Sequence, residues 1–554
     1  MEHRSALAKS SPFFSFPPNR IRKGSRMSNF YNVIYEMENY NLLRPVPYKA
    51  LTFYNTERVN AFLLDIVKNN RSVFIYGDYD PDGLFCALSA HDSLKLLGCT
   101  KVRIYKYKKR THMLDDLAVT ECIQAMPDYC IICDTGSSEL DKLEILVSYG
   151  IKVIILDHHN TIYKYSDFEN VGSGNTNSFS PTSSDEVGHS PVAIINTTIE
   201  NQLEGKKVYE LSAGALTFCV FDTFAKSIEK DISSLSAYAL VSLYADSMNM
   251  GNPINRSIYF LAHTFSQEEL PSKIQMFMHA NSSFYSRFIQ FRLIPKINAI
   301  FRTEKFEYIN ECFFDDEIRA ADKVRYLEAI DSIYTSNRNM VLAVADTIEY
   351  EEMDNFILAN LESVSEYFKI KENKLYNYTG LIANKLSDRC GKPAVVYCPM
   401  RNYYKGSFRD ISGRNYLQIF KQLCSAGGHG AAFGIKIPYL EFNSFLHNFK
   451  RLDSDFPIAE LQNKPIIFDY GYVNADTKLI RDMALYNEFA GQDIPLVYLK
   501  KVFSANMTGG KTKFYYLYNW DGCTIQSSFA LSVGDTILLQ PIRNKTLRAI
   551  AIKM

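Results

Sequence analysis

Residues 72–83 decide the fold of this chain, and they read Ser-Val-Phe-Ile-Tyr-Gly-Asp-Tyr-Asp-Pro-Asp-Gly. The run from Ser72 to Tyr76 is rich in β-branched and aromatic residues, which favours a short buried strand. Three carboxylates follow this strand directly, namely Asp78, Asp80 and Asp82. The next stretch, Leu84 to Leu97, has the character of a helix. A strand, an acidic loop and a helix in this order predict the first unit of an α/β fold.

The same alternation continues along the chain to about residue 156. Further strands are expected at Val102–Tyr105, Tyr129–Cys133 and Val153–Leu156, and further helices at Leu117–Met126 and Glu139–Tyr149. This pattern predicts a doubly wound, mainly parallel sheet. In such sheets the ligand binds beyond the carboxyl ends of the strands, so functional residues are expected there.

Acidic and histidine side chains gather at these strand ends. Asp134 follows the third strand, Asp157-His158-His159 follow the fourth, and Asp246 follows the apolar run 239–245. Carboxylates and imidazoles that converge at one edge cannot all stay charged and unpaired, because like charges repel. A pair of divalent cations removes this repulsion, and oxygen-rich ligands with imidazole suit Mn²⁺ or Mg²⁺. Two such ions about 3.5–4 Å apart can clamp the attacking and leaving oxygens of a phosphoryl transfer.

Each of these features has an ordinary explanation when it is taken alone. A single Asp at a strand end is commonly a helix cap. The Asp-x-Asp-x-Asp-Gly pattern also resembles a calcium loop, but an EF-hand needs Glu at its twelfth position, where this chain has Ser89. The joint occurrence of the clusters favours the two-metal site.

The ordered set of motifs resembles that of the DHH phosphoesterases, and of their RecJ branch in particular. The matching segments of the first half are Gly77–Gly83 for motif I, Cys133–Gly136 for motif II, Asp157–His159 for the motif that names the family, and Ala245–Asp246 with Asn255–Arg256 for motif IV. Downstream, Lys405–Arg409 and Gly427–His429 resemble the signatures of the associated DHHA1 domain, and Asn487–Pro495 resembles the junction to the OB domain of RecJ. One departure is Tyr76, which stands where many DHH enzymes carry a His, although RecJ relatives often lack that His as well.

This resemblance implies roles for the matching residues. Asp80 and Asp134 would hold one metal ion, while Asp82, Asp134, His158 and Asp246 would hold a second, with Asp78 as a further ligand. Asp157 would orient the site, and His159 would contact the scissile phosphate. Substrate contacts are implied for Arg110, Asn255, Arg256, Lys405, Ser407, Arg409, Gly427, Gly428 and His429.

The resemblance also implies an activity. It predicts a 5′-to-3′ exonuclease that hydrolyses single-stranded DNA to mononucleotides, with water activated by two Mn²⁺ or Mg²⁺ ions. Single-stranded DNA would be the partner, with a single-strand-binding protein as a candidate second partner. One alternative keeps the chemistry but acts on short oligoribonucleotides or cyclic dinucleotides. Another is a non-catalytic RecJ-like component of replication or repair. The OB-like C-terminus disfavours the first alternative, and the complete set of ligand positions disfavours the second.

Pattern and resemblance together divide the 554 residues into five segments. We expect an N-terminal tail and lead-in at 1–44, the DHH catalytic domain at 45–340, a connecting helix at 341–370, a smaller α/β DHHA1 domain at 371–460 and an all-β, OB-like barrel at 461–554. The helix prediction rests on Glu349–Phe368, which is acidic with spaced apolar residues. A loop is expected at 171–184, which is rich in Gly, Ser, Asn and Thr.

Two features of the C-terminal segment carry separate predictions. Gly509-Gly510 and Asp521-Gly522 lie between alternating apolar runs, which is typical of hairpin turns. Aromatic residues recur at every second position on one strand face, namely Phe514, Tyr516, Tyr518 and Trp520. Such a stripe serves either as the core of the barrel or as a platform on which bases stack.

The composition limits the kinds of binding surface and cellular compartment that are expected, but it indicates no specific chemistry. The chain has 61 basic and 61 acidic side chains, so any basic surface for nucleic acid must be local. Cys130 and Cys133 form a CxxC within a predicted strand, where positions i and i+3 face opposite sides and cannot share a metal. We therefore expect ordinary core thiols in a reducing, cytoplasmic compartment.

No apolar run is long enough to predict a membrane span. The basic first 26 residues fit a transit peptide or a tail before a start at Met27, and we prefer the tail.

Overall fold

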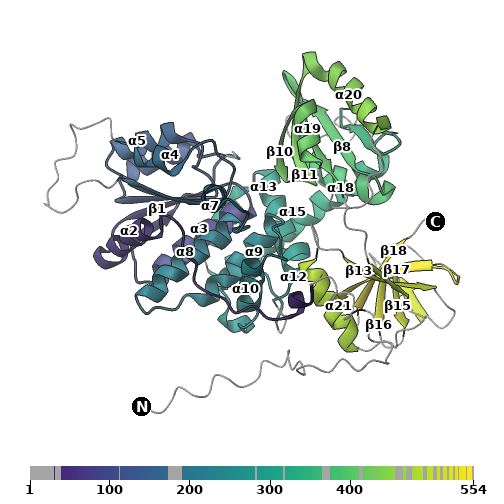
Figure 1. Cartoon of the computed structure of the whole chain (residues 1–554), viewed down its shortest axis with the longest axis horizontal. Coiled ribbons are helices and arrows are strands. Elements are labelled where there is room, and N and C mark those ends of the chain that lie inside the picture. The colour runs from purple at the N-terminus through teal and green to yellow at the C-terminus, as the bar shows by residue number, and fades with distance from the viewer. Residues whose placement is uncertain are drawn as a thin grey trace, which may run out of the picture. The chain divides into compact units, whose positions relative to one another are not determined.

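The computed structural model forms two compact units (Figure 1). The smaller comprises Met1–Lys49, Asn249–Glu269 and Asn463–Met554, and the larger comprises Ala50–Met248 and Leu270–Gln462. The residues that the structure describes are 30, 39–110, 113–172, 190–280, 284–315, 319–362, 364, 375–410, 416–429, 431–455, 466–469, 477–490, 496–502, 508–511, 516–520, 523–527, 531–534, 536–543 and 546–551. The first 26 residues and most of the loop predicted at 171–184 lie outside them.

A five-stranded parallel sheet forms the first half of the larger unit. Its strands are β1 (Val73–Gly77), β2 (Val102–Ile104), β3 (Tyr129–Cys133), β4 (Lys152–Asp157) and β5 (Val192–Asn196), in the order β2-β1-β3-β4-β5. The chain changes direction across the sheet between β1 and β3, and this switch point opens a crevice beyond their carboxyl ends. The predicted doubly wound sheet is confirmed. The sequence pattern missed β5, because the strand follows the loop that interrupts the alternation.

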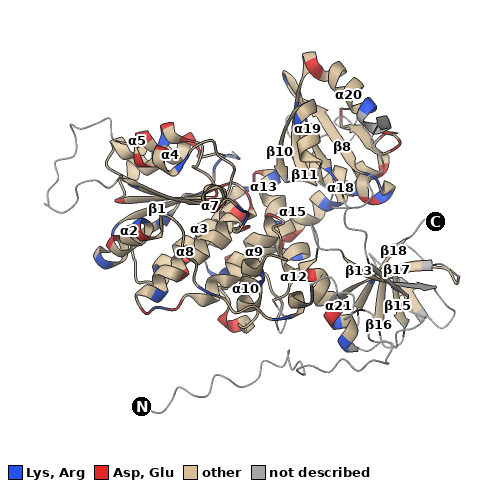
Figure 2. Ribbon diagram, in the orientation of Figure 1, with Lys and Arg blue, Asp and Glu red and all other residues tan. Residues whose placement is uncertain are grey.

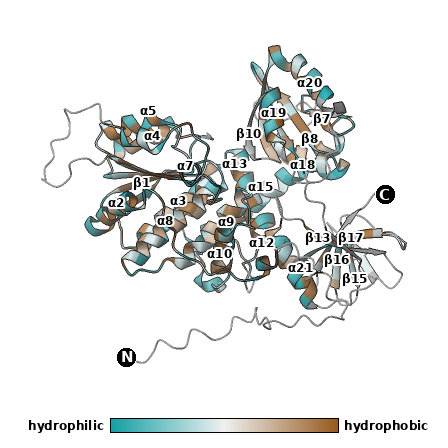
Figure 3. Cartoon of the chain, in the orientation of Figure 1, coloured by the Kyte–Doolittle hydropathy of each residue, from teal (hydrophilic) through white to brown (hydrophobic). Residues whose placement is uncertain are grey.

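Helices cover both faces of this sheet, with α4 and α5 on one side and α2, α3 and α8 on the other (Figure 1). Helices α2, α4 and α5 mix hydrophilic and hydrophobic colouring and are buried along one side, whereas α3 and α8 are buried over nearly their whole length (Figure 3). The helices of this half are α2 (Thr56–Asn69), α3 (Pro81–Leu96), α4 (Asp116–Ala125), α5 (Leu140–Ser148), α6 (Tyr165–Glu169), α7 (Thr197–Glu204), α8 (Ala213–Ser227), η2 (Ser233–Leu235) and α9 (Ser236–Ala245). Helix α3 begins earlier than predicted, because Asp80 caps it and Pro81 fits its first position.

A helical segment follows in the larger unit. Its elements are α11 (Ser272–Gln275), α12 (Ser286–Phe288), η4 (Ile289–Leu293), α13 (Ile294–Thr303), α14 (Phe306–Phe314) and α15 (Ala320–Thr347). Acidic and basic residues are interspersed over these helices, in keeping with a net charge of zero (Figure 2).

The second half of the larger unit is a six-stranded mixed sheet in the order β10-β11-β9-β8-β7-β6. The strands are β6 (Tyr350–Glu352), β7 (Ile357–Asn360), β8 (Ala394–Pro399), β9 (Tyr403–Arg409), β10 (Ser425–His429) and β11 (Ala432–Pro438). The accompanying helices are η5 (Tyr376–Tyr378), α18 (Thr379–Cys390), α19 (Leu417–Leu423), η6 (Tyr439–Glu441) and α20 (Phe442–Asp455).

The predicted connecting helix at 341–370 is wrong over residues 348–360, and most of its last ten residues lie outside the described part of the chain. Helix α15 ends at Thr347, and strands β6 and β7 follow. Successive residues of the run Phe356–Leu361 enter two different hydrophobic cores, with Phe356 and Leu358 on one face and Ile357 and Ala359 on the other. A strand buried on both faces reads as a continuous apolar run, which does not distinguish it from a buried helix.

The smaller unit contains a seven-stranded sheet in the order β12-β13-β17-β18-β16-β15-β14. Its strands are β12 (Ile466–Asp469), β13 (Val497–Val502), β14 (Thr508–Lys511), β15 (Tyr516–Trp520), β16 (Cys523–Ser527), β17 (Thr536–Arg543) and β18 (Thr546–Ala551). The unit also contains η1 (Asn39–Leu43), α10 (Pro253–Ala262), η3 (Gln267–Glu269) and α21 (Thr477–Phe489). Helix α21 is an addition to the expected all-β segment.

One of the two predicted hairpin signals is borne out. Strands β15 and β16 pair antiparallel with Trp520 opposite Cys523, as a two-residue turn at 521–522 requires. The Gly-Gly prediction is wrong, because Gly509 lies inside strand β14. A Cβ on Gly509 would lie 2.4 Å from the Tyr518 ring, so glycine here permits a close approach rather than a turn.

Burial favours the core function for one residue of the aromatic stripe. Tyr518 is 9% exposed, and its hydroxyl accepts a hydrogen bond from the backbone N–H of Leu531 at 2.8 Å. Phe514 and the side chain of Trp520 lie outside the described residues.

The cysteines behave as the sequence predicts. All eleven are free, and Cys130 contacts Cys122 while Cys133 contacts Cys86. Among the helices that the structure describes, none combines the length and the apolar character needed to span a bilayer.

Candidate metal centre and anion pocket

Strand register brings the first two acidic segments together at the switch point. Gly77 of β1 pairs with Cys133 of β3, so Asp78 and Asp134 leave neighbouring strands at the same level. Asp78 donates its backbone N–H to the Cys133 carbonyl at 3.3 Å, and Asp134 donates to the Leu156 carbonyl at 2.9 Å. Asp134 has a left-handed backbone with φ of 63°, a conformation that Asp and Asn tolerate better than most residues.

The predicted ligands form groups whose donor atoms lie within 4.8 Å of one another. One group contains Asp78, Asp80 and Asp134, and another contains Asp82, His158 and Asp246. A third joins Asp134 to both histidines of the Asp-His-His motif.

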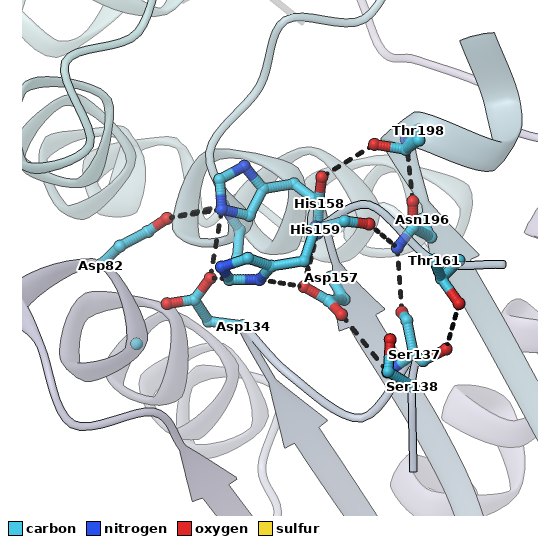
Figure 4. A network of polar contacts seen from close by, with 12 residues as sticks. Asp82, Asp134, Ser137, Ser138, Asp157, His158, His159, Thr161, Asn196 and Thr198 are labelled. Atoms are coloured by element: carbon cyan, nitrogen blue, oxygen red, sulfur yellow. Dashed lines mark hydrogen bonds and ion pairs between the residues drawn. The ribbon is translucent and has the colours of Figure 1, made fainter. Parts of the chain in front are cut away.

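His158 links these groups. Its Nε2 lies 3.3 Å from Asp134 Oδ1, 3.5 Å from Asp246 Oδ2 and 3.8 Å from Asp82 Oδ2. Figure 4 shows the His158 ring between Asp82 and Asp134. The fold therefore places carboxylates from three separate segments around one imidazole.

Asp82 is anchored by the first turn of α8. Its two oxygens accept hydrogen bonds from the backbone N–H groups of Ala213 and Gly214, each at 2.9 Å. The Ser242 hydroxyl also donates to Asp82. A helix N-terminus stabilises an anion, and a carboxylate keeps a further acceptor position after three hydrogen bonds.

Crowding of acids raises the pKa of the buried carboxyls. Burial, followed by the charges of Asp246 and Asp80, raises the pKa of Asp82 well above its ordinary value. Burial and the charges of Asp82, Asp80 and Asp78 do the same to the pKa of Asp134. Such a set of carboxylates with imidazole is complementary to hard divalent cations, so the donor chemistry fits Mn²⁺ or Mg²⁺.

Asp157 fixes the Asp-His-His motif. Its Oδ1 accepts hydrogen bonds from the backbone N–H groups of His158 at 2.7 Å and His159 at 3.1 Å, and lies 2.8 Å from His159 Nδ1. Burial opposes ionisation of Asp157, but the hydrogen bond and charge of His159 outweigh it and lower the pKa of Asp157. Burial also opposes the charge on His159, but the hydrogen bond and charge of Asp157 raise the pKa of His159 to about 10. The two shifts favour an ion pair between Asp157 and His159, whose ring remains partly exposed.

Asn196 is a positioning residue that the sequence prediction missed. Its Nδ2 donates to the Ser137 hydroxyl at 2.9 Å and to the His159 carbonyl at 3.0 Å, while its Oδ1 caps α7 (Figure 4). The nearby Thr198 hydroxyl donates to the His158 carbonyl at 2.9 Å. Asn196 ends strand β5, so the rule that located the acids at strand ends would have found it had β5 been recognised.

Tyrosines support the first acidic loop from behind. Tyr107 donates its hydroxyl to the Asp78 carbonyl at 3.1 Å. Tyr79 and Tyr105 donate to Asp115 Oδ2 at 3.0 and 3.1 Å. Tyr76, which replaces the His of many DHH enzymes, is fully buried and donates to the Met113 carbonyl at 2.9 Å. Tyr76 therefore serves the packing of this loop.

A cavity of about 270 Å³ in the same unit has the opposite character. Four cations and no acidic residue line it, and the cations are Arg110, Arg302, Lys405 and Arg409. Three of these were predicted as substrate contacts, together with Ser407, which also lines the cavity. The sequence prediction missed Arg302, because no local pattern in α13 distinguishes it from an ordinary surface arginine.

Asn377 connects the walls of this anion pocket. Arg110 Nη1 donates to Asn377 Oδ1 at 2.6 Å, and Asn377 Nδ2 donates to the Arg302 carbonyl at 3.1 Å. The Nε of Arg110 is buried without a hydrogen-bond partner. Arg409 packs against α18, where a Cβ on Gly380 would lie 2.6 Å from Arg409 Nη2.

Burial and mutual repulsion weaken the protonation of these cations. Burial, then the charges of Arg110 and Arg409, lowers the pKa of Arg302 to about 10. Burial alone lowers the pKa of Arg409 to about 10, and burial followed by the charge of Arg110 lowers the pKa of Lys405. Arg302, Arg409 and Lys405 are thus buried cations, and an anion in the pocket would stabilise their charge.

The remaining predicted substrate residues lie elsewhere. Asn255 and Arg256 belong to the smaller unit, where both are buried and Arg256 stacks on Phe489 with its Cζ 6.0 Å from the ring centroid. Gly427, Gly428 and His429 form part of β10 and do not line the pocket.

Comparison with known proteins finds a family model that matches most of the first half of the larger unit. Residues 72–217 match the model of the DHH family, N-terminal domain. The single-stranded-DNA-specific exonuclease RecJ of Haemophilus influenzae is 18% identical over 441 residues, which are 76% of this chain and 73% of that protein.

Solved structures share the fold at low identity. RecJ in complex with Mn²⁺ from Thermus thermophilus has a TM-score of 0.67 at 16% identity, covering 96% of this chain and 76% of that one. An exonuclease RecJ bound to manganese has a TM-score of 0.53 at 16% identity, covering 75% of this chain and 99% of that one. The resemblance to the DHH family and RecJ is therefore confirmed, and the similarities support a nuclease or phosphoesterase.

Proposed function

We propose that this chain, whose residues 72–217 match the DHH family, is a metal-dependent 5′-to-3′ exonuclease that hydrolyses single-stranded DNA to mononucleotides. The observation that carries the proposal is the linkage of the two ligand groups through His158 and Asp134, whose atoms lie 3.3 Å apart. This arrangement offers two neighbouring cation sites, and phosphodiester hydrolysis is the reaction that paired divalent cations commonly serve.

The two ligand groups divide the work of holding the cations. Asp78, Asp80 and Asp134 would hold one ion, and Asp82, His158 and Asp246 would hold the other. When bound, the ions supply charge neutralisation and a means of activating water. Their charge also offsets the repulsion that raises the pKa of Asp82 and Asp134.

His159 supplies a separate positive charge. Asp157 holds the proton on His159 Nδ1, which leaves Nε2–H to donate to a non-bridging oxygen of the scissile phosphate. Because Asp157 is fixed by three hydrogen bonds, the imidazolium is oriented before the substrate arrives.

The anion pocket supports cleavage that begins at the end of a DNA strand and not within it. A terminal phosphate monoester carries about −1.5 to −2 charges at neutral pH, whereas an internal phosphodiester carries about −1. Four cations around a cavity of about 270 Å³ suit the more highly charged terminal group. We assign the 5′ phosphate to this pocket because of the similarity to RecJ.

A second candidate function uses the same two sites on a smaller substrate. A cavity that admits one phosphate group also accommodates the end of a dinucleotide or short oligoribonucleotide. The complete ligand set disfavours a non-catalytic role. Buried acids with raised pKa values destabilise the folded chain, and such destabilising groups are typically retained at functional sites.

Strand degradation tests the proposal directly. Strands of about 30 nucleotides, labelled at either the 5′ or the 3′ end, are incubated with Mn²⁺ or with EDTA. We expect immediate release of the 5′ label as a mononucleotide, no release in EDTA, and no release by Asp134→Asn. Asp141→Asn, which removes an exposed acid of α5, should cleave normally. Intact DNA under all conditions, together with cleavage of a dinucleotide, would establish the second candidate instead.

A further inference from the structure

One short segment links the candidate metal centre to the anion pocket. The segment is residues 105–110, which follow β2 and end at Arg110 of the pocket. Tyr105 continues along the sheet, because its backbone N–H donates to the Ile75 carbonyl at 2.8 Å. Tyr105 and Tyr107 are buried, whereas the lysine that follows each of them is exposed. The two tyrosines therefore attach the segment to the interior of the larger unit.

Tyr107 holds the segment against the metal centre. Its hydroxyl donates to the Asp78 carbonyl at 3.1 Å, and its ring centroid lies 4.7 Å from that of Tyr79. Asp78 is a candidate metal ligand, and Tyr79 separates it from the next candidate, Asp80. Tyr107 therefore fixes the backbone that carries two of the candidate ligands.

Asn310 of α14 fixes the backbone of Tyr107. Its Oδ1 accepts a hydrogen bond from the Tyr107 N–H at 2.9 Å, and its Nδ2 donates to the Tyr107 carbonyl at 3.0 Å. One side chain thus satisfies both backbone groups of a buried residue, as a neighbouring strand would. Asn310 is itself only 9% exposed, so solvent does not compete for these bonds. We call this pair the Tyr107–Asn310 clamp.

Pocket residues lie immediately beyond the clamp. Arg110 follows Tyr107 by three positions, and its Nη1 donates to Asn377 Oδ1 at 2.6 Å. Phe301, which precedes Arg302 in α13, packs edge-on against the Tyr107 ring with the centroids 5.3 Å apart. Asn377 in turn donates to the Arg302 carbonyl. Two of the four pocket cations are therefore tied to the residue that holds the loop of the metal centre.

We propose that the Tyr107–Asn310 clamp sets the spacing between the metal centre and the anion pocket, and thereby the length of the product. This inference rests on the proposed function, in which the pocket holds the 5′ phosphate and the metal centre cleaves a phosphodiester bond. The number of nucleotides between the two sites is then the number released by each cut.

The length of the link fits this role. The chain from Tyr107 to Arg110 spans at most about 11 Å, which is the length of about three stacked nucleotides. A link this short and held by two backbone bonds distinguishes a mononucleotide from a dinucleotide. Tyr107 and Asn310 are positioning residues, because they act through Asp78 and Arg110.

Asn310→Ala tests the clamp, because it removes both bonds to the Tyr107 backbone and leaves every candidate ligand and pocket cation in place. A strand of about 20 nucleotides with a labelled 5′ phosphate is cleaved with Mn²⁺, and the first labelled product is sized. We expect kcat to fall about 10-fold and KM to stay within about twofold of the wild type, because binding survives and alignment is lost. Labelled dinucleotide should appear beside mononucleotide, with bound-metal content unchanged.

Asn487→Ala is the matched control. Asn487 holds Val497 of the smaller unit in the same way, since its Oδ1 accepts from the Val497 N–H at 2.8 Å and its Nδ2 donates to the Val497 carbonyl at 2.9 Å. This variant loses a comparable pair of hydrogen bonds, but its only labelled product should be the mononucleotide. The pair of variants separates general destabilisation of the chain from a change in the spacing of the two sites.

The other outcomes decide against the inference. Mononucleotide as the only product of Asn310→Ala, at any rate of cleavage, would overturn it, and so would a loss of bound metal. If Asn310→Ala does not fold, Tyr107→Phe replaces it, because Phe keeps the ring contacts and the backbone bonds but frees the Asp78 carbonyl. Its products should include dinucleotide with a smaller fall in kcat, and mononucleotide alone would again overturn the inference.

The wild type distinguishes this inference from the proposed function. A wild type that hydrolyses no DNA with Mn²⁺ would refute the proposed function and the inference that rests on it. A wild type that releases mononucleotides, beside an Asn310→Ala variant with the same product, would refute the role of the clamp alone.

Discussion

The candidate metal centre and the anion pocket lie in the same compact unit but are built in opposite ways. The metal centre gathers carboxylates that each follow a strand or helix end within a short motif. The pocket gathers four cations from a loop, from α13 and from β9, which are far apart in the sequence. Each site holds like charges close together, so each is incomplete without a ligand of the opposite sign.

This difference extends to the supporting residues. Asn196 holds the Asp-His-His motif through a side chain that also caps α7, and Asn377 joins Arg110 to the Arg302 backbone. In both sites a buried asparagine donates and accepts, which aligns charged groups without adding to the charge. Variants that remove one charged side chain from each site, and then one supporting residue, test whether the two sites work in these opposite ways.

The largest effect is expected from Asp134→Asn. Asn keeps the shape of the side chain and tolerates the positive φ of 63°, so the fold should persist while the shared cation ligand is lost. We expect activity with Mn²⁺ to fall at least about 1,000-fold, because such a ligand stabilises the transition state by several kcal/mol. Steady-state cleavage and bound-metal content, each measured beside Asp141→Asn, check this prediction. If the Asp134→Asn variant keeps its full metal content and full activity, Asp134 is not a metal ligand.

Removal of one pocket cation should have a smaller and more selective effect. Arg302→Gln should reduce the preference for a 5′-phosphorylated over a 5′-hydroxyl strand by about 100-fold, since a charged hydrogen bond contributes roughly 1.5–3 kcal/mol. The ratio of kcat/KM values for the two strands is the measurement. Arg103→Gln removes an exposed arginine of β2 and should leave the ratio unchanged. An equal loss on both strands would mean that Arg302 supports the fold and not the terminal phosphate.

Removal of a support should weaken the metal centre less than removal of a ligand. Asn196→Ala deletes the bonds to Ser137 and to the His159 carbonyl, and we expect kcat to fall about 10-fold as the motif loosens. Thr198→Val removes only the bond to the His158 carbonyl and should have less effect. Metal titrations followed by activity would show whether the loss lies in cation affinity. An unchanged kcat would indicate that β4 alone holds the motif.

The smallest effect concerns stability without metal. The pKa values of Asp82 and Asp134 are raised in the folded chain, so the folded state binds protons more tightly than the unfolded one. Their favourable contribution is complete below the ordinary Asp pKa of 3.8 and is lost as pH rises toward the raised values.

In EDTA, the unfolding midpoint of the wild type should therefore fall more steeply than that of Asp134→Asn, by a few degrees, as the pH rises above the ordinary Asp pKa of 3.8. Mn²⁺ should reverse the order, because only the wild type binds it fully. If the unfolding midpoints of the two proteins depend on pH in the same way in EDTA, repulsion among the buried carboxylates does not contribute to stability.

Local pattern was sufficient for the first sheet and for its acids. Strands β1, β3 and β4 lie within a residue or two of their predicted positions, and the acidic groups follow them. The same reasoning failed where an apolar run is buried on two faces, as at Phe356–Leu361, because burial on both sides removes the alternation that marks a strand.

The sequence by itself determined the doubly wound sheet and the positions of the candidate metal ligands, because those residues lie beside strong local signals, while Arg110, Lys405 and Arg409 were implied only by the resemblance to the RecJ branch. Only the tertiary structure decided that Arg302 joins Arg110 and Arg409, and that Asn196 and Asn377 hold the two sites. These features depend on contacts between segments that are distant in the chain. Such contacts arise from packing of whole elements, and no short stretch of residues encodes them.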